Sequence, residues 1–305
     1  MESSDLCRYW KIRINRNLQP LTISDLKSNF IHALSDIYPP EEIESFFNIL
    51  AQELLNLSRI QISLDREQLV SAKNIDEVEK AIARLKMLEP IQYIVGNTEF
   101  FGLTLKVSPS TLIPRPETEE LVQYIIDDVS RLENKTDPVE LLDIGTGSGC
   151  IAISLAKNLR NSKVSAMDVS SAALKIAHEN ARDNKVNITL LEQDVLLSET
   201  LPEKYDIIVS NPPYVRELEK EWMQPNVLKH EPELALFVKD SDPLIFYRKI
   251  AELSRESLKP NGKLYFEINE YLGEEMSELL VELGFRDIEI KKDIFEKDRM
   301  LKCSL

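Results

Sequence analysis

Apolar residues in the first ninety positions recur at helical spacing. After Pro39, apolar side chains three or four positions apart predict an amphipathic helix that begins at Pro40 and runs through Leu57. A second helix is predicted from Asn74, as its N-cap, to a stop at Pro90. We therefore expect residues 1–89 to form a small helical domain.

The period of the pattern changes after Pro90. Gly96 and Gly102 punctuate short β-prone runs, and Leu103, Leu105 and Val107 alternate with polar residues. This alternation is typical of half-exposed strands. Residues 91–109 are predicted to form a β-hairpin, within a linker that spans residues 90–115.

From Glu117 onward, helical patterns alternate with short apolar runs. The predicted helices cover residues 117–132, 150–160, 171–184, 242–258 and 273–283. The predicted strands cover residues 139–144, 163–167, 187–191, 205–210, 263–268, 286–291 and 299–303. Such alternation is typical of a parallel, doubly wound sheet. The fold class expected for residues 116–305 is therefore α/β and Rossmann-like, with seven strands.

The charge balance argues against a protein that coats nucleic acid. The chain has 37 Lys and Arg against 52 Asp and Glu, a formal net charge of −15. Residues 90–305 carry −12 of that charge. A phosphate backbone attracts the opposite sign, so we expect no direct binding to nucleic acid.

Cysteine and histidine are too sparse for a metal site or a disulfide framework. Cys7, Cys150 and Cys303 are scattered without a CxxC pair, and the chain has three histidines. This usage is typical of a reducing compartment. The chain also lacks an apolar leader and any apolar run close to the length of a membrane span. We expect a cytoplasmic protein without metal or membrane contact, and a monomer.

A glycine-rich loop follows the first strand of the predicted sheet. It consists of Gly145, Thr146, Gly147, Ser148 and Gly149, and an apolar helix comes directly after it. Glycines there let a ligand approach the backbone at the carboxyl edge of a sheet. Asp143 precedes the loop by two residues, and Cys150 stands where an NAD-binding motif would have its third glycine. The pattern fits NAD poorly and S-adenosylmethionine well.

Two acidic residues close the next strands. Asp168 lies about 20 residues beyond the loop, where a carboxylate can accept hydrogen bonds from both ribose hydroxyls of a nucleoside. Asp194 closes the third strand and precedes Val195. An acid at that place can accept a hydrogen bond from an adenine amino group, and a solvated turn acid is an equally good interpretation.

The sharpest motif, Asn211-Pro212-Pro213-Tyr214, follows the fourth strand at the same edge. A planar NH2 group is a weak nucleophile because its lone pair is delocalised, so holding it in place is the main catalytic contribution. The Asn211 side-chain oxygen can accept one N–H, and the carbonyl of Asn211 or Pro212 the other. Tyr214 offers a face to a planar group. Taken alone, the motif is equally well a proline-rich turn; after the glycine loop and Asp168 it indicates methyl transfer to such a nitrogen.

Longer strings surround these motifs: LLDIGTGSGCIAISLA and YDIIVSNPPYV in the sheet, PIQYIVG and FFG after residue 89, and LIPRPETE at residues 112–119. With them the chain resembles the peptide chain release factor N(5)-glutamine methyltransferases, the PrmC/HemK family, over nearly its whole length. Helix capping explains part of the last string, because Pro116 suits a first helical position and Glu117 and Glu119 suit its positive end. Capping does not explain Arg115.

The resemblance implies an N-terminal helical domain that helps to grip a release factor, a linking hairpin, and a class I methyltransferase domain. The methyl group would pass from S-adenosylmethionine, which becomes S-adenosylhomocysteine, to the side-chain amide nitrogen of the glutamine in the Gly-Gly-Gln loop of a class 1 release factor. The implied cofactor-binding residues are Gly145, Thr146, Gly147, Ser148, Gly149, Asp168, Asp194, Val195 and Asn211. The implied substrate-binding residues are Arg115, Glu117, Thr118, Asn211, Pro212, Pro213 and Tyr214, with Asn211, Pro212 and Tyr214 as the catalytic set.

Two positions depart from the family's pattern, and a third offers a candidate general base. Val195 stands where many relatives carry an aromatic residue, so adenine packing is expected to be weaker or supplied elsewhere. Glu296 replaces a usual glycine before the last strand, and we expect a local change in that loop without consequence for chemistry. His230 lies in residues 215–241, which resemble the family's substrate-side insertion; a packing role is favoured over a general base, because the sequence names no partner for it.

Three other functions share parts of this pattern. A ribosomal-protein glutamine methyltransferase would have the same NPPY motif and cofactor loop. An adenine-N6 methyltransferase acting on nucleic acid would use the same acceptor geometry, but it would carry basic patches. A non-catalytic binding protein could keep the fold, although the intact Asp143, Asp168 and Asn211 argue against that.

Overall fold

The computed structural model describes residues 21–131 and 137–305. They divide into two units, one that ends at Val95 and one that begins at Gly96. Cys7 lies outside the described residues. The predicted domain boundaries near residues 90 and 115 stay predictions.

The first unit is helical, as its periodicity predicts. Its described helices are α2 (Ile23–Leu34), α3 (Pro40–Leu55), α4 (Arg59–Leu64), α5 (Ala72–Leu85) and α6 (Ile91–Val95). The helix predicted from Pro40 is α3, which ends where Asn56 adopts a left-handed conformation. Asn74 is not the N-cap of α5. Ser71 takes that place one turn earlier, since its side chain accepts a hydrogen bond from the Asn74 backbone N–H at 3.2 Å.

The core of this unit consists of the apolar faces of α2, α3 and α5. Phe30 and Phe47 meet edge to face, with ring centroids 5.5 Å apart, and Leu34, Leu50 and Leu85 are fully buried around them. Each of these side chains contributes about 1.5–3 kcal/mol through burial. The first unit therefore has its own hydrophobic core, made entirely from residues 23–95.

A short hairpin opens the second unit. Strand β1 (Asn97–Phe100) pairs antiparallel with β2 (Leu103–Lys106). The prediction that this hairpin starts at residue 91 was wrong, because Ile91–Val95 form helix α6. The Pro90 carbonyl accepts the N–H groups of Tyr93 and Ile94 at 3.0 and 3.1 Å, which closes a helical turn in an apolar, strand-like sequence.

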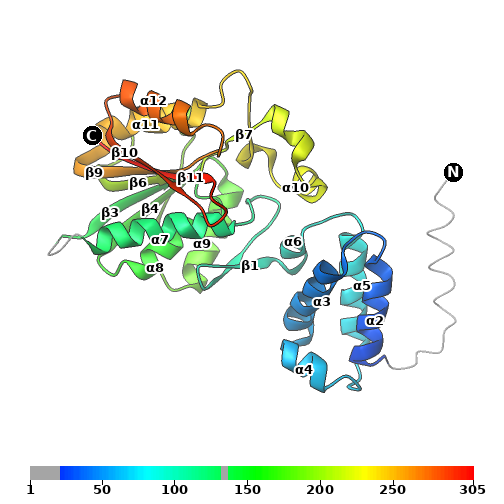
Figure 1. The fold of residues 1–305 in the computed structure, drawn as a ribbon. Helices are drawn as coiled ribbons and strands as arrows, with labels where there is room; N and C mark the ends of the chain where they lie inside the picture. The colour runs from blue at the N-terminus through cyan, green and yellow to red at the C-terminus, as the bar shows by residue number, and fades with distance from the viewer. Residues whose placement is uncertain (1–20, 132–136) are drawn as a thin grey trace. The chain divides into compact units, whose positions relative to one another are not determined.

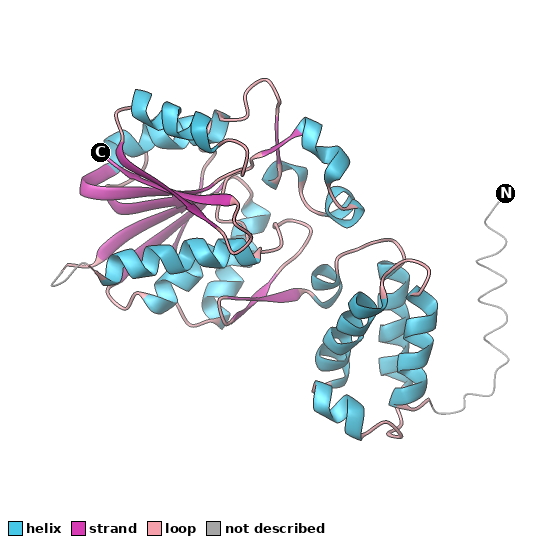
Figure 2. Cartoon of the chain, viewed as in Figure 1, coloured by secondary structure: helices cyan, strands magenta, loops and turns pink. Residues whose placement is uncertain are grey.

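Seven strands form one mixed sheet in the order β10-β11-β9-β6-β3-β4-β5 (Figures 1 and 2). Five adjacent strands run parallel to one another: β3 (Val139–Ile144), β4 (Ser162–Asp168), β5 (Thr189–Glu192), β6 (Tyr205–Ser210) and β9 (Leu258–Glu267). Strand β11 (Asp298–Ser304) runs antiparallel to β9 and to β10 (Arg286–Lys292). The fully parallel sheet that we predicted was wrong at this strand. Five residues between β10 and β11 are too few for a parallel crossover, so they form a hairpin.

Helices cover both faces of the sheet, which makes it doubly wound (Figure 1). On one face lie α7 (Pro116–Ser130), α8 (Cys150–Asn158) and α9 (Ser171–Asp183); on the other lie α11 (Ile245–Ser257) and α12 (Gly273–Glu282). The predicted α/β, seven-stranded Rossmann-like fold is confirmed. No helix in the described ranges is long and apolar enough to cross a bilayer.

Residues 215–238 form a small insertion after β6. It contains β7 (Val215–Arg216), the 3-10 helix η1 (Glu217–Trp222), α10 (Pro225–His230), the 3-10 helix η2 (Glu233–Ala235) and β8 (Phe237–Val238), and β7 pairs parallel with β8. The insertion therefore begins just beyond the carboxyl end of β6, the edge of the sheet where α/β folds bind ligands.

Candidate active site

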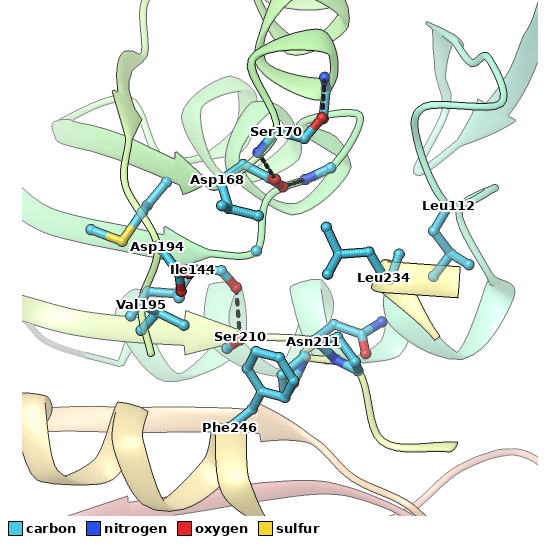
Figure 3. A pocket seen from close by; sticks show the side chains of 18 of the residues that line it. Leu112, Ile144, Asp168, Ser170, Asp194, Val195, Ser210, Asn211, Leu234 and Phe246 are labelled. Carbon is cyan, nitrogen blue, oxygen red and sulfur yellow. Dashed lines mark hydrogen bonds between the residues drawn. The ribbon is translucent and has the colours of Figure 1, made fainter. Parts of the chain in front are cut away.

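A pocket of about 340 Å³ lies at the carboxyl edge of the sheet (Figure 3). Its walls come from the loop after β3, the ends of β4, β5 and β6, helix α11, and the segments around Leu112 and Leu234. The strand order reverses at β3. The chain runs from β3 to β4 and β5 on one side, and it then crosses to β6 on the other side of β3. Such a switch point is the usual ligand site in an open α/β sheet.

The glycine loop divides its residues between the pocket and the core behind it. Gly145 and Gly147 line the pocket, whereas Thr146 and Ser148 are buried. Gly147 has a φ of +55°, which favours glycine. A Cβ on Gly149 would lie 2.8 Å from Ile153 Cδ1 and 3.2 Å from Ala177 Cβ, so this glycine allows α8 and α9 to pack closely.

Asp143 holds the glycine loop in place through hydrogen bonds. Its Oδ2 accepts hydrogen bonds from Thr146 Oγ1 at 2.6 Å and from the Ala152 N–H at 3.3 Å. The side chain is buried, and this burial raises its pKa to about 7. Asp143 thus joins the end of β3, the glycine loop and the first turn of α8.

Asp168 presents two oriented carboxylate oxygens to the pocket. Oδ2 accepts the Gly147 N–H at 2.8 Å, and Oδ1 accepts the Ser170 N–H at 2.9 Å (Figure 3). Each oxygen has further acceptor capacity. Two neighbouring hydroxyl groups of a ligand, such as those of a ribose, can therefore both donate to Asp168.

The end of β5 and helix α11 supply the apolar walls. Asp194 and Val195 line the pocket, and Asp194 Oδ1 accepts the Leu196 N–H at 2.8 Å. Val169 and Phe246 line it as well. Phe246 was not among the predicted site residues, because an aromatic residue on an amphipathic helix has no sequence signal that separates a pocket wall from core packing.

The NPPY segment forms the wall across from Asp168 (Figure 3). Asn211, Pro212 and Pro213 line the pocket directly after β6. Ser210 Oγ donates to the Ile144 carbonyl at 2.7 Å, which holds the ends of β6 and β3 together. Tyr214 is not among the lining residues, and its hydroxyl donates to Glu267 Oε1 at 3.0 Å.

A buried acid behind this wall was not among the predicted site residues. Glu267, the last residue of β9, is 1% exposed and accepts a hydrogen bond from Thr118 Oγ1 at 2.6 Å. Burial raises the pKa of its carboxyl group. The available indication was its place at the end of a predicted strand, the same place that Asp168 occupies on β4.

The LIPRPETE segment is tied to the insertion. Arg115 Nη2 donates to Glu231 Oε1 at 2.6 Å, and Glu231 Oε2 accepts the Ile113 N–H at 3.2 Å. Glu231 is buried, so this ion pair is a structural tie between the segments that carry Leu112 and Leu234. Arg115, Glu117, Thr118 and His230 are not among the residues that line the pocket.

Comparisons with known proteins agree with this geometry. A model of the methyltransferase small domain matches residues 128–231, and a model of the PrmC N-terminal domain matches residues 26–96. The release factor glutamine methyltransferase of Flavobacterium psychrophilum is 50% identical over 93% of this chain and 99% of its own. This chain belongs to the release factor glutamine methyltransferase family. The Bacteroides thetaiotaomicron family member is also 50% identical, over 89% of this chain and 96% of its own.

Membership in this family confirms that the chain is a methyltransferase, as its motifs indicate. Among solved structures, the hMettl16 catalytic domain in complex with MAT2A 3'UTR hairpin 6 has a TM-score of 0.51 and 15% identity, covering 78% of this chain and 84% of that chain. At that identity the likeness concerns the fold alone.

Proposed function

We propose that this enzyme binds S-adenosylmethionine in the pocket and methylates the side-chain amide nitrogen of the glutamine in the Gly-Gly-Gln loop of a class 1 peptide chain release factor. The observation that carries the proposal is the place of Asn211. Its side chain lines the pocket across from the carboxylate of Asp168 and carries an amide oxygen that can accept a hydrogen bond.

The residues of the pocket fit the cofactor. Asp168 has acceptor capacity for both ribose hydroxyls, and Gly147 lets a ligand approach the backbone. Asp194 can accept a hydrogen bond from the adenine amino group, while Val169, Val195 and Phe246 offer apolar contacts to a planar ring. Phe246 supplies the aromatic surface that Val195 lacks. When bound, S-adenosylmethionine supplies a methyl group on a positively charged sulfur.

The NPPY residues prepare the substrate nitrogen. Asn211 Oδ1 accepts one N–H of the glutamine amide, and the carbonyl of Asn211 or Pro212 accepts the other. Both hydrogens then point at acceptors, and the nitrogen lone pair is directed toward the methyl group. The two acceptors stabilise the positive charge that develops on nitrogen, and the proton leaves to water afterwards.

The remaining predicted substrate residues have indirect roles in the proposed reaction. Tyr214 offers its ring to the glutamine amide while Glu267 holds its hydroxyl. Arg115 acts through Glu231, keeping Leu112 and Leu234 at the mouth of the pocket. Glu117, one residue before Thr118, adds negative charge that raises the pKa of the Glu267 carboxyl group.

The net charge supports a protein acceptor over nucleic acid. The unit that holds the pocket belongs to a chain with net charge −15, which repels a phosphate backbone. We propose that the enzyme works as a monomer in the cytoplasm, where a translation factor is available to it.

Mass spectrometry of a purified release factor tests the proposed function. After incubation with the enzyme and S-adenosylmethionine, we expect one added methyl group on the glutamine of the Gly-Gly-Gln loop, and none on a factor with that glutamine replaced by alanine. Asn211→Ala should lower kcat by about 100-fold or more, because a preorganised acceptor is lost.

Asn158→Ala is the matched control, since Asn158 lies exposed at the end of α8 and does not line the pocket. This variant should retain wild-type kcat. Methylation of a ribosomal protein or of nucleic acid, with the release factor left unmodified, would refute the proposal.

A further inference from the structure

A chain of hydrogen bonds runs from the buried end of β9 to the pocket. Thr118 Oγ1 donates to Glu267 Oε2 at 2.6 Å, and Asn211 Nδ2 donates to Thr118 Oγ1 at 3.3 Å. Glu267 and Thr118 are 1% and 2% exposed, whereas Asn211 lines the pocket. Thr118 therefore contacts Asn211 directly, and Glu267 acts on Asn211 through Thr118, although neither residue lines the pocket.

The donor and acceptor roles in these two hydrogen bonds are determined by the single hydroxyl proton of Thr118. Because that proton is donated to the Glu267 carboxylate, Thr118 can offer only lone pairs to Asn211. An amide oxygen in the same place would face another acceptor. The Asn211 side chain must therefore turn its NH2 group toward Thr118 and its Oδ1 away from it.

We infer that Glu267 and Thr118 are positioning residues that select the amide orientation in which Asn211 Oδ1 is available to the substrate nitrogen. The inference rests on the proposed function, in which Asn211 Oδ1 accepts an N–H of the glutamine. With the amide reversed, the Asn211 NH2 group would face the NH2 group of the substrate glutamine, and both would be hydrogen-bond donors. That orientation cannot hold the substrate nitrogen.

The ionised state of Glu267 is essential to this arrangement. A protonated carboxyl group could donate to Thr118, which would then turn its own proton toward Asn211 and favour the reversed amide. The charged and titratable groups that act on Glu267 come from several elements: Tyr214 after β6, Tyr247 on α11, Arg299 on β11, Glu117 on α7 and Cys150 on α8. Burial is the largest influence and raises the pKa of this carboxyl group, whereas Thr118, Tyr214 and Arg299 favour its charged form.

Two substitutions of Thr118 separate orientation from packing. Thr118→Val keeps the shape of the side chain and removes the hydroxyl, whereas Thr118→Ser keeps the hydroxyl. In the full-length enzyme with release factor and S-adenosylmethionine, Thr118→Val should lower kcat by about tenfold or more. The KM for the release factor and the Kd for S-adenosylmethionine should stay within about threefold of wild type, and Thr118→Ser should keep most of the wild-type kcat.

The dependence of kcat on pH gives a second measurement. Wild-type kcat should fall on the acidic side as Glu267 is protonated. Tyr214→Phe removes a donor to that carboxylate, so the acidic limb should move to higher pH, whatever the size of kcat. A limb that stays in place in Tyr214→Phe would contradict the inference.

The amide orientation can also be read without activity. In 15N-labelled enzyme, the side-chain NH2 resonances of Asn211, assigned by their loss in Asn211→Ala, should shift in Thr118→Val and stay near wild type in Thr118→Ser. Equal kcat in the two Thr118 variants, or unchanged NH2 resonances in Thr118→Val, would overturn the inference. A wild-type enzyme that leaves the release factor unmethylated would instead refute the proposed function, and the resonances would still decide the orientation.

Discussion

At the scale of single residues, the acids around the pocket differ in their burial and in the groups that they contact. Asp168 and Asp194 line the pocket, while Asp143 and Glu267 are buried behind it, where burial raises the pKa of both carboxyl groups. The two buried acids hold hydroxyl donors in place: Thr146 for Asp143, Thr118 for Glu267. Their contribution is to orient neighbours rather than to contact a ligand.

Asp143 gives a prediction about stability and pH. Its pKa is about 7 in the folded chain against 3.8 for an ordinary Asp, so the unfolded chain releases this proton first. The group therefore favours folding below about pH 4, and this contribution is lost as pH rises to about 7. Asp143→Asn keeps an oxygen for Thr146 and Ala152 but cannot ionise.

Relative to wild type, the free energy of unfolding of Asp143→Asn should rise with pH by about 1.4 kcal/mol per unit in the middle of that window. Denaturant unfolding of both proteins from pH 4 to pH 8 measures this difference. If the free energy of unfolding has the same pH dependence in both proteins, Asp143 is ionised in the folded chain throughout this pH range, which would contradict the prediction.

At the element scale, the hairpin between β10 and β11 makes a tight turn without glycine. Glu296 has a φ of 60°, in the left-handed region, and its backbone N–H donates to the Asp293 carbonyl at 2.9 Å. The left-handed conformation costs a residue with a side chain roughly 1–2 kcal/mol. The expected loop change at Glu296 is therefore a strained residue where a glycine would be relaxed.

Glu296→Gly should stabilise the enzyme by about 0.5–1 kcal/mol, because relief of strain exceeds the added freedom of the unfolded chain. Gly284 is the matched control: its φ is +87° and a Cβ there would meet nothing within 4 Å. Gly284→Ala should destabilise by a similar amount. Chemical denaturation measures both, and a less stable Glu296→Gly would contradict this account of the turn.

At the scale of the whole molecule, the pocket depends on one of the two units. Every residue that lines it lies between Ser110 and Ile250, and the two core clusters around the sheet contain no residue before Phe100. The helical unit has a separate core. Cofactor binding and grip on a protein substrate are therefore expected to be separable.

A fragment of residues 96–305 should bind S-adenosylmethionine with a Kd within about threefold of the full chain. Its KM for a release factor should rise by roughly tenfold, since uniform binding energy is lost, while a short Gly-Gly-Gln peptide should be methylated equally by both proteins. Calorimetry and steady-state kinetics measure these quantities. A folded fragment that fails to bind the cofactor would show that the first unit is needed for the pocket.

The elements of this protein follow from local sequence. Hydrophobic period separates helices from strands, so the strand at residues 139–144 and the strand at 205–210 have the predicted bounds. The glycine loop, Asp168 and NPPY were found because each directly follows a strand, and parallel strands bring their carboxyl ends to one edge. Local competition explains the errors: Ser71 and Asn74 are both good caps, and one turn of helix fits the apolar run at 91–95.

Only the tertiary structure decided which side chains act on one another. Thr118 and Glu267 are 149 positions apart, Arg115 and Glu231 are 116 apart, and neither pair has a period or spacing that links its members. Likewise, Phe246 becomes a pocket wall only through the packing of α11 on the sheet. Periodicity and motifs depend on neighbours along the chain, and they determined the elements, the ligand edge and the role that we propose for Asn211. The hydrogen bonds of that amide join helix α7 to the ends of β6 and β9, and they exist only after the sheet and its helices have assembled.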